Sequence, residues 1–233
     1  MITLAMDFSE IKAIIFDFDG TLYDFKGLTK KLLLSIPFSL FKAKAERETR
    51  RFFKGKSFAS KEEFQNSYFS FLASKTHTSP EKAKKWYDSV YMKAMVKTLK
   101  RNFRKREDAD KILKTLKENG IKTAVFSDYG LVEKRLEAVG LSPSLFDLCT
   151  DAETMGGLKP AKTSFEKVAE LLKTESENCL MVGDRSDTDG KGALSSGMKF
   201  IQIRTHKTPE NEKNSPTGIL SWEDFSSLIL SSL

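Results

Sequence analysis

Two carboxylates stand two residues apart at the end of an apolar run near the start of the chain. Ile14, Ile15 and Phe16 form the run, and Asp17 and Asp19 follow it in the stretch AIIFDFDGTL. Side chains two residues apart on a strand point to the same face, so these acids would repel each other without a cation or a proton nearby. The pair therefore suits metal binding or acid–base chemistry.

Further polar residues follow other apolar runs of the chain. The run KTAVFSD ends in Ser127 and Asp128, and the run CLMVGD ends in Gly183 and Asp184. Lys159 lies in the loop GGLKP, after a predicted strand near residues 147–152. In an open parallel sheet, ligands bind beyond the carboxyl ends of the strands. We therefore expect one edge of the sheet to collect Asp17, Asp19, Ser127, Asp128, Lys159 and Asp184.

Strands and helices alternate in the part of the chain that would position these residues. After residue 106, apolar residues at helical spacing alternate with short apolar runs, and a last helix is expected over 222–230. This alternation predicts an α/β fold, with a Rossmann-like three-layer core in which helices cover both faces of a parallel sheet. The run before Asp17 adds a further buried strand to that sheet.

Residues 25–100 lack such strands and show helical spacing instead, for example at Phe64, Tyr68, Phe71 and Leu72. We predict a catalytic core formed by residues 1–23 and 103–233, and a small all-helical cap formed by residues 24–102. The stretch KGKSFAS, residues 54–60, is the best candidate for a flexible joint within this insert.

The insert is strongly basic. Residues 26–106 hold 22 Lys and Arg against six Asp and Glu, although the whole chain has a net charge of only +7. The simplest interpretation is an aromatic core surrounded by solvated Lys and Arg side chains. Two alternatives are steering of a phosphorylated small molecule into the site, and binding of nucleic acid or an anionic membrane.

Composition and segment lengths restrict the class of protein. With 39% hydrophobic and 30% charged residues, the chain is typical of soluble globular proteins. Its first residues do not resemble a secretory signal, and the apolar run 32–41 is interrupted by Pro37, so we expect no membrane span and a cytoplasmic location. Cys149 and Cys179 lack metal-ligand spacing and are expected to be reduced, packed thiols. A monomer and a homodimer both remain open.

The predicted cluster of acids, lysine and serine suits one kind of chemistry. Several carboxylates at one sheet edge form a hard-oxygen site for Mg²⁺. A lysine and a serine hydroxyl beside that site would bind phosphoryl oxygens. Of the opening pair, one carboxylate could attack phosphorus and form an aspartyl-phosphate, while the other protonates the leaving oxygen.

Four motifs in order now define a resemblance that spans the whole chain. These are DFDGT at 17–21, the Ser of VFSD at 127, the Lys of LKP at 159 and GDRSDTD at 183–189. They resemble the motifs of the haloacid dehalogenase-like hydrolase superfamily, which also inserts a helical cap after its first motif.

The resemblance implies a role for each matched residue. Asp17 matches the nucleophile and first metal ligand, and Asp19 matches the general acid/base, whose backbone carbonyl also contacts Mg²⁺. Ser127 and Lys159 match the phosphate-binding pair, and Lys159 is also implied as a catalytic residue that neutralises the surroundings of the nucleophile. Asp184 matches a metal-binding acid. For the remaining roles, we assign Asp189 rather than Asp187 as the further metal ligand, and Asp128, where many relatives have Asn, as a phosphate-binding residue.

Within this superfamily, the presence of Asp19 favours phosphoryl transfer, because dehalogenases usually lack an acid at that position. We expect a Mg²⁺-dependent phosphomonoester hydrolase that acts on a small phosphorylated metabolite. The alternatives are a sugar-phosphate mutase or phosphotransferase, and a catalytically silent scaffold that binds nucleic acid or an anionic partner through the basic insert. Ser127 could also serve as a helix N-cap.

Overall fold

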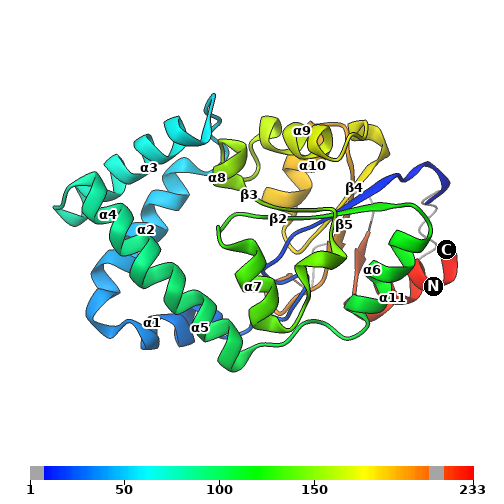
Figure 1. The fold of residues 1–233 in the computed structure, drawn as a ribbon, viewed down its shortest axis with the longest axis horizontal. Helices are drawn as coiled ribbons and strands as arrows, with labels where there is room; N and C mark the ends of the chain where they lie inside the picture. The colour runs from blue at the N-terminus through cyan, green and yellow to red at the C-terminus, as the bar shows by residue number, and fades with distance from the viewer. Residues whose placement is uncertain (1–7, 210–217) are drawn as a thin grey trace.

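A computed structural model describes residues 8–209 and 218–233 of the chain (Figure 1). Within these residues, six parallel strands form one sheet in the order β3-β2-β1-β4-β5-β6. The strands are β1 Ala13–Phe16, β2 Lys122–Ser127, β3 Leu148–Asp151, β4 Cys179–Gly183, β5 Lys199–Ile203 and β6 Ile219–Leu220. The predicted α/β fold with a parallel sheet is therefore confirmed.

The register of the sheet brings the carboxyl ends of three strands to one level. Phe16 at the end of β1 lies opposite Val125 of β2 and Val182 of β4. All four residues of β1 are buried, as expected for a strand covered on both faces. Asp17, Ser127 and Asp184 therefore each lie within two residues of these paired positions, at the same edge of the sheet.

Helices cover both faces of the sheet (Figure 1). One face carries α6 Ala109–Glu118, α7 Val132–Val139 and α11 Trp222–Ser232, and the other carries α9 Lys162–Leu171 and α10 Lys191–Ser195. The predicted helical spacing holds in α6, where Ala109, Ile112, Leu113 and Leu116 are all buried. A short helix, α8 Ala152–Met155, and a π-helical turn, Ser186–Gly190, follow β3 and β4.

The segment between β1 and α6 is helical, as its spacing predicted. It contains α1 Leu28–Ser35, α2 Leu40–Phe53, α3 Lys61–Thr76, α4 Pro80–Trp86 and α5 Met92–Asn102, with a π-helical turn, Tyr87–Tyr91, before α5. Figure 1 shows these helices together at one end of the molecule, on the left of the view. Their division from the rest of the chain as a separate cap domain stays a prediction.

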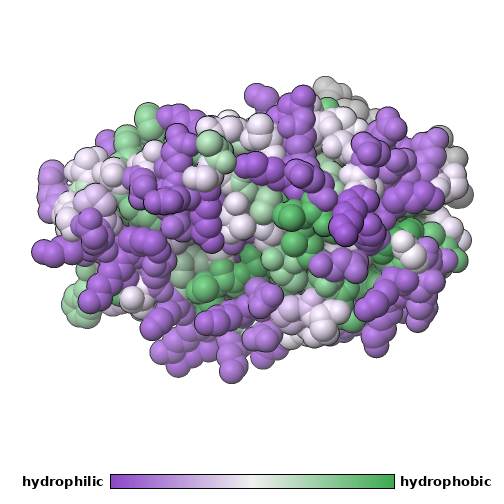
Figure 2. Space-filling model, turned by 45° about the horizontal axis from the view of Figure 1, so that its top comes forward, coloured by the Kyte–Doolittle hydropathy of each residue, from purple (hydrophilic) through white to green (hydrophobic). Residues whose placement is uncertain are grey.

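Aromatic side chains form the interior of this helical segment. Phe53, Phe64, Tyr68 and Phe69 are at most 3% exposed, and the rings of Phe53 and Tyr68 lie 5.3 Å apart between centroids. Hydrophilic residues cover most of the segment on the face seen at the left of Figure 2. The expected aromatic core is therefore present, and the role of the Lys and Arg side chains around it stays open.

Several details differ from the sequence-based expectations or extend them. Strand β6 was not predicted, since its two residues are too short to show a period. The proposed flexible joint is tethered, because the Gly55 and Phe58 backbone N–H groups donate to the carbonyls of Leu158 and Gly156 at 3.2 and 2.7 Å. Both cysteines are free thiols. None of the described helices is long and apolar enough to cross a membrane.

Candidate active site

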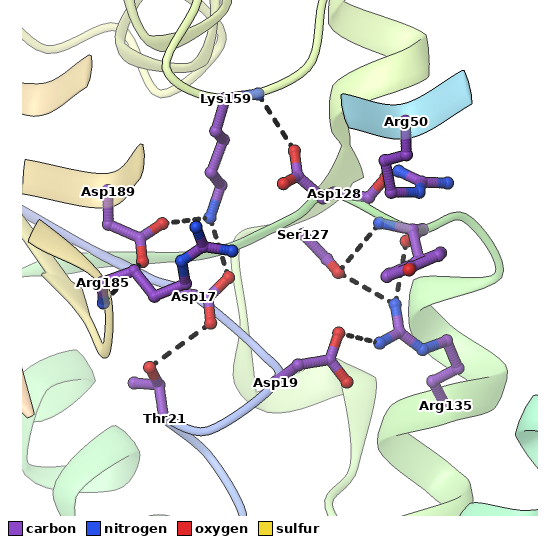
Figure 3. Close-up of polar contacts among 11 residues, drawn as sticks. Asp17, Asp19, Thr21, Arg50, Ser127, Asp128, Arg135, Lys159, Arg185 and Asp189 are labelled. Carbon is purple, nitrogen blue, oxygen red and sulfur yellow. Dashed lines mark hydrogen bonds and ion pairs between the residues drawn. The ribbon is translucent and has the colours of Figure 1, made fainter. Parts of the chain in front are cut away.

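Asp17 lies directly after β1, beneath the loops that follow the neighbouring strands (Figure 3). Its backbone N–H donates to Val182 at 2.8 Å, which extends the β1–β4 ladder by one residue. One carboxylate oxygen accepts a hydrogen bond from Lys159 Nζ at 2.8 Å, and the other accepts one from Thr21 Oγ1 at 3.4 Å. The residue is only 8% exposed, so its carboxylate is fixed at the end of the strand.

Three acids meet at this point. Ligand atoms of Asp17, Asp184 and Asp189 all lie within 4.8 Å of one another, and all three residues are buried. Two glycines make this approach possible. A Cβ on Gly20, which has a φ of +102°, would lie 2.6 Å from Asp184 Oδ2, and a Cβ on Gly183 would lie 2.5 Å from Asp189 Oδ2.

The charge of the three acids is only partly compensated within the protein, by the single ammonium of Lys159. Burial raises the pKa of the Asp17 carboxyl to about 7; Lys159 opposes this shift, whereas Asp189 and Asp19 add to it. Burial likewise raises the pKa of Asp184 to about 9, with Asp17 and Asp189 acting in the same direction. An oxygen-lined site with excess negative charge fits a divalent cation such as Mg²⁺.

Lys159 contacts two of the three acids. Its ammonium donates hydrogen bonds to Asp17 Oδ1 and Asp189 Oδ1, both at 2.8 Å, and its side chain is 1% exposed. Burial alone would lower the pKa of Lys159, but Asp17 and Asp189 outweigh burial and raise it above its ordinary value. The side chain therefore carries a fixed positive charge beside Asp17.

Asp19 points away from the three-acid cluster. One of its carboxylate oxygens accepts a hydrogen bond from Arg135 Nη2, and the other accepts one from the Tyr23 hydroxyl. Arg135 is fully buried on α7 and stacks over the Phe18 ring, 4.5 Å from its centroid. The Asp19 side chain is thus held separately from Asp17, and a metal contact from this residue would have to come from its backbone carbonyl.

Ser127 is completely buried at the end of β2. Its Oγ accepts hydrogen bonds from Arg135 Nη1 at 2.9 Å and from the Tyr129 backbone N–H at 3.2 Å. The alternative of a helix N-cap is wrong for α7, whose N-cap position is Leu131 and has no side-chain hydrogen bond. Ser127 Oγ instead closes a short turn with the Tyr129 backbone and faces Arg135 (Figure 3).

Asp128 supports the loop that carries Lys159. Its Oδ1 accepts a hydrogen bond from the Lys159 backbone N–H at 3.0 Å, and its own backbone carbonyl accepts one from Arg50 Nη1 at 2.8 Å. Burial raises the pKa of the Asp128 carboxyl, and Lys159 opposes that shift. These contacts favour a positioning role for the side chain, and phosphate binding by Asp128 stays a prediction.

Asp187 lies outside the acid cluster, whereas Asp189 belongs to it, and the choice of Asp189 as a metal ligand stays a prediction. Its carboxylate is 54% exposed and forms ion pairs with Lys54 and Arg185. Although partial burial would raise its pKa, Arg185 and Lys54 outweigh burial and lower the pKa of Asp187 to about 2. Asp189 is instead 2% exposed and faces Lys159.

A cavity of about 1060 Å³ extends from these strand ends to the helical segment. Binding sites for small molecules have volumes of roughly 300–1,000 Å³, so a metabolite-sized ligand would fit. The sheet side contributes acids and Lys159, while the helical segment contributes an apolar part and a basic part. The apolar part includes Leu28, Leu32, Leu33, Tyr91 and Met95.

Arg50 of α2 joins the helical segment to the end of β2. Besides its bond to Asp128, it donates to Glu46 Oε1 at 2.9 Å and to the Tyr87 hydroxyl at 3.0 Å. Its guanidinium also lies over the Tyr129 ring, 3.8 Å from the centroid. This buried contact orients α2 relative to the strand ends.

A family model for haloacid dehalogenase-like hydrolases matches residues 11–197, which is most of the chain. The chain belongs to the haloacid dehalogenase-like hydrolase family, as the resemblance of its four motifs implied.

Two curated relatives and one solved structure illustrate the likeness. The phosphoglycolate phosphatase of Aquifex aeolicus is 38% identical over 89 residues, which are 37% of this chain and 41% of that protein. The pyrimidine 5′-nucleotidase of Escherichia coli is 33% identical over 103 residues, 44% of each protein. The matches thus span less than half the length of these relatives. A 2-haloacid dehalogenase from Pseudomonas syringae pv. Tomato shares the fold, with a TM-score of 0.65, 15% identity and coverage of 95% of this chain and 98% of that chain.

Proposed function

We propose that this chain is a Mg²⁺-dependent phosphomonoesterase that acts through an aspartyl-phosphate intermediate on a small phosphorylated metabolite. The main support is the position of Asp17, whose carboxylate contacts the buried Lys159 and belongs to the three-acid cluster. The phosphatase and nucleotidase names of the two curated relatives support the same type of reaction. The acid at position 19 favours phosphoryl transfer over dehalogenation, because a phosphate ester has a leaving oxygen that needs a proton.

The proposed first step forms a covalent bond between the protein and the substrate. A carboxylate oxygen of Asp17 attacks phosphorus, and the bond from phosphorus to the leaving oxygen breaks. Asp19 donates a proton to that leaving oxygen. Arg135 and Tyr23 keep the Asp19 carboxyl in one orientation during this transfer.

The second step restores the protein. A water molecule attacks the phosphorus of the aspartyl-phosphate, and Asp19 accepts a proton from that water. The bond between phosphorus and Asp17 breaks, so inorganic phosphate leaves and the Asp17 carboxylate is free again. Each turnover therefore consumes one water and returns both acids to their starting forms.

Lys159 and Ser127 are the proposed phosphate-binding residues. The Lys159 ammonium lies beside the attacking carboxylate and can donate to a phosphoryl oxygen as well. Ser127 Oγ accepts two hydrogen bonds, and no acceptor for its own proton is found among the described residues. That hydroxyl proton is available to the phosphate, while Asp128 holds the Lys159 backbone.

Mg²⁺ would be held by Asp17, Asp184 and Asp189, together with the backbone carbonyl of Asp19. When bound, the ion would neutralise the three carboxylates and stabilise negative charge on the phosphoryl oxygens. Residues 24–102 would form the cap, since their helices supply the opposite wall of the cavity.

The experiment that tests the proposal measures phosphate release from an aryl phosphate and from a panel of phosphorylated metabolites. Wild-type protein is compared in Mg²⁺ and in EDTA with an Asp17→Asn variant and a control variant, Asp24→Asn, whose carboxylate is exposed and outside the cavity. We expect metal-dependent release by wild type and by Asp24→Asn, and none by Asp17→Asn. Brief acid quenching during turnover should also trap labelled phosphate on the wild-type protein.

The same assay separates the alternatives. Transfer of labelled phosphate to a second sugar instead of water would indicate a mutase or phosphotransferase. Activity of the folded Asp17→Asn variant would refute the nucleophile assignment. A folded wild-type protein that releases no phosphate but binds RNA in a salt-sensitive manner would favour the binding scaffold.

A further inference from the structure

One face of helix α2 presents a row of cations to the cavity. Four cationic residues line the cavity: Lys44, Arg47 and Arg51 of the helix, and Lys54, which follows the helix directly. At 3.6 residues per turn, their spacings of three, four and three residues place them on one side of the helix. The row therefore forms the basic part of the cavity wall that faces the strand ends.

Three of these cations lack a protein partner. Lys54 pairs with Asp187. The side chains of Lys44, Arg47 and Arg51 are exposed, and they form no hydrogen bond or ion pair with any of the described residues. The two acids of the same helix do not neutralise them, because Glu46 is buried against Arg50 and Glu48 does not line the cavity.

A row of like charges is unfavourable for a helix in the absence of a ligand. Neighbouring like charges three or four residues apart destabilise a helix, and here two such steps connect Lys44, Arg47 and Arg51. Of the acids that line the cavity, Asp17 and Asp189 contact Lys159 and Asp19 contacts Arg135, and none of the lining acids, Asp184 included, forms an ion pair with Lys44, Arg47 or Arg51. The unpaired charge is thus available to an anion that enters the cavity.

The row has a defined direction relative to the reacting group. Lys54 forms a backbone bridge with Leu158, the residue before Lys159, so the carboxyl end of α2 lies at the proposed phosphate site. With a rise of 1.5 Å per residue, Arg51 and Arg47 lie about 5 and about 10 Å farther along the helix. An anionic group bound there would be separated from the transferred phosphoryl group by a small carbon skeleton.

We propose that the substrate is a phosphomonoester whose leaving group carries a second anionic group, a carboxylate or a phosphate, bound by Arg47 and Arg51. This inference rests on the proposed phosphatase function and specifies its substrate class. A planar guanidinium can form paired hydrogen bonds to either kind of anion, which makes arginine suitable for both. The two arginines are specificity residues of the cavity and take no part in bond breaking.

The test compares aryl phosphates that differ in the charge of one substituent. These are 4-carbamoylphenyl phosphate as the neutral reference, 4-carboxyphenyl phosphate and 1,4-phenylene bisphosphate, each measured with Mg²⁺. The variants are Arg47→Gln/Arg51→Gln and the matched control Lys82→Gln/Lys85→Gln. The control removes two exposed charges from α4 of the same helical segment, at positions that do not line the cavity.

For wild type, we expect kcat/KM to be at least about tenfold higher with one or both anionic compounds than with the neutral reference. The arginine variant should lose this preference mainly through a higher KM, whereas the control should retain it. A preference for the carboxylated compound or for the bisphosphate identifies which anion is bound. Thermal unfolding of each variant verifies that it is folded.

Three results overturn the inference alone. Wild type hydrolyses all three compounds without preferring an anionic one, the arginine variant keeps the preference of wild type, or the control variant loses as much preference as the arginine variant. The third result would mean that the overall field of the basic segment is responsible. If folded wild type hydrolyses none of the three compounds or the metabolite panel, the proposed function itself fails, and this inference fails with it.

Discussion

Replacement of Lys159 by methionine tests how the acid cluster is held together. Methionine has a similar length and no charge, so Lys159→Met removes the ammonium with little change in side-chain volume. The wild-type ammonium donates to Asp17 and to Asp189 at 2.8 Å, and all three side chains are largely buried. Without it, Asp17, Asp184 and Asp189 would remain within 4.8 Å of one another with no cation between them.

The expected loss of stability follows from these contacts. A hydrogen bond between charged groups contributes roughly 1.5–3 kcal/mol, and removal of one partner from a buried ion pair costs roughly 3–5 kcal/mol. We therefore expect the free energy of unfolding of the metal-free protein to fall by about 4 kcal/mol at pH 8. The matched control, Lys162→Met, removes an exposed lysine that pairs with Glu166 and should cost no more than about 1 kcal/mol.

The loss should also depend on pH and on metal. In the folded Lys159→Met protein, one of the crowded acids is expected to hold an additional proton. Its stability deficit should then shrink by about 1.4 kcal/mol for each pH unit by which the pH is lowered from 8 toward 6. Mg²⁺ should recover part of the deficit at pH 8, because the ion supplies positive charge to the same carboxylates.

Urea unfolding followed by circular dichroism, in EDTA and in Mg²⁺ at pH 6, 7 and 8, measures these quantities. Equal losses for Lys159→Met and Lys162→Met would show that the buried ammonium does not stabilise the cluster. A large loss that does not change with pH would attribute the effect to packing rather than to charge.

Three further predictions test other parts of the site and the core. Asp189→Asn should weaken Mg²⁺ binding by about tenfold or more in calorimetric titrations, whereas Asp187→Asn should not, and equal affinities would contradict the choice between them. The metal-free protein should lose stability as the pH rises from 4 to 9. The reason is that Asp17 and Asp184, with folded pKa values of about 7 and about 9, hold protons that the unfolded chain releases near 3.8. A melting temperature in EDTA that rises over this range would refute the predicted direction. Gly192→Ala should lower the free energy of unfolding by roughly 1–3 kcal/mol, because its Cβ would lie 2.0 Å from a phenylalanine ring carbon; an unchanged urea midpoint would show that the ring can move away.

Much of the fold could be predicted from the spacing of apolar residues within short segments of the sequence. The buried strands and the helices behind them have distinct periods, and α11, expected over 222–230, begins at Trp222 as predicted. Ser127 at a strand end and Lys159 in the loop after a strand could be assigned to one edge, because a parallel sheet aligns the ends of its strands. Strand β6 was missed because two residues have no measurable period.

The residues that sequence reasoning missed depend on contacts between distant segments. Arg135 had a weak signal, because its spacing from Val132 and Val139 places it on the buried face of α7, where an arginine needs a carboxylate partner. Nothing in the local sequence identifies Asp19 as that partner, 116 positions away. The contacts of Arg50 with Asp128 and Tyr129 were hidden for the same reason, among many basic residues of the insert.

The order of the strands has a consequence for folding during synthesis. Strand β1 pairs with β2, which begins at Lys122, and with β4, which ends at Gly183. At about 5–20 residues per second, β4 leaves the ribosome roughly 10–30 s after β1. The helices between β1 and β2 make mostly local contacts and can assemble during that interval. The apolar run that precedes Asp17 therefore lacks one of its two neighbouring strands throughout this interval, which exposes the chain to aggregation.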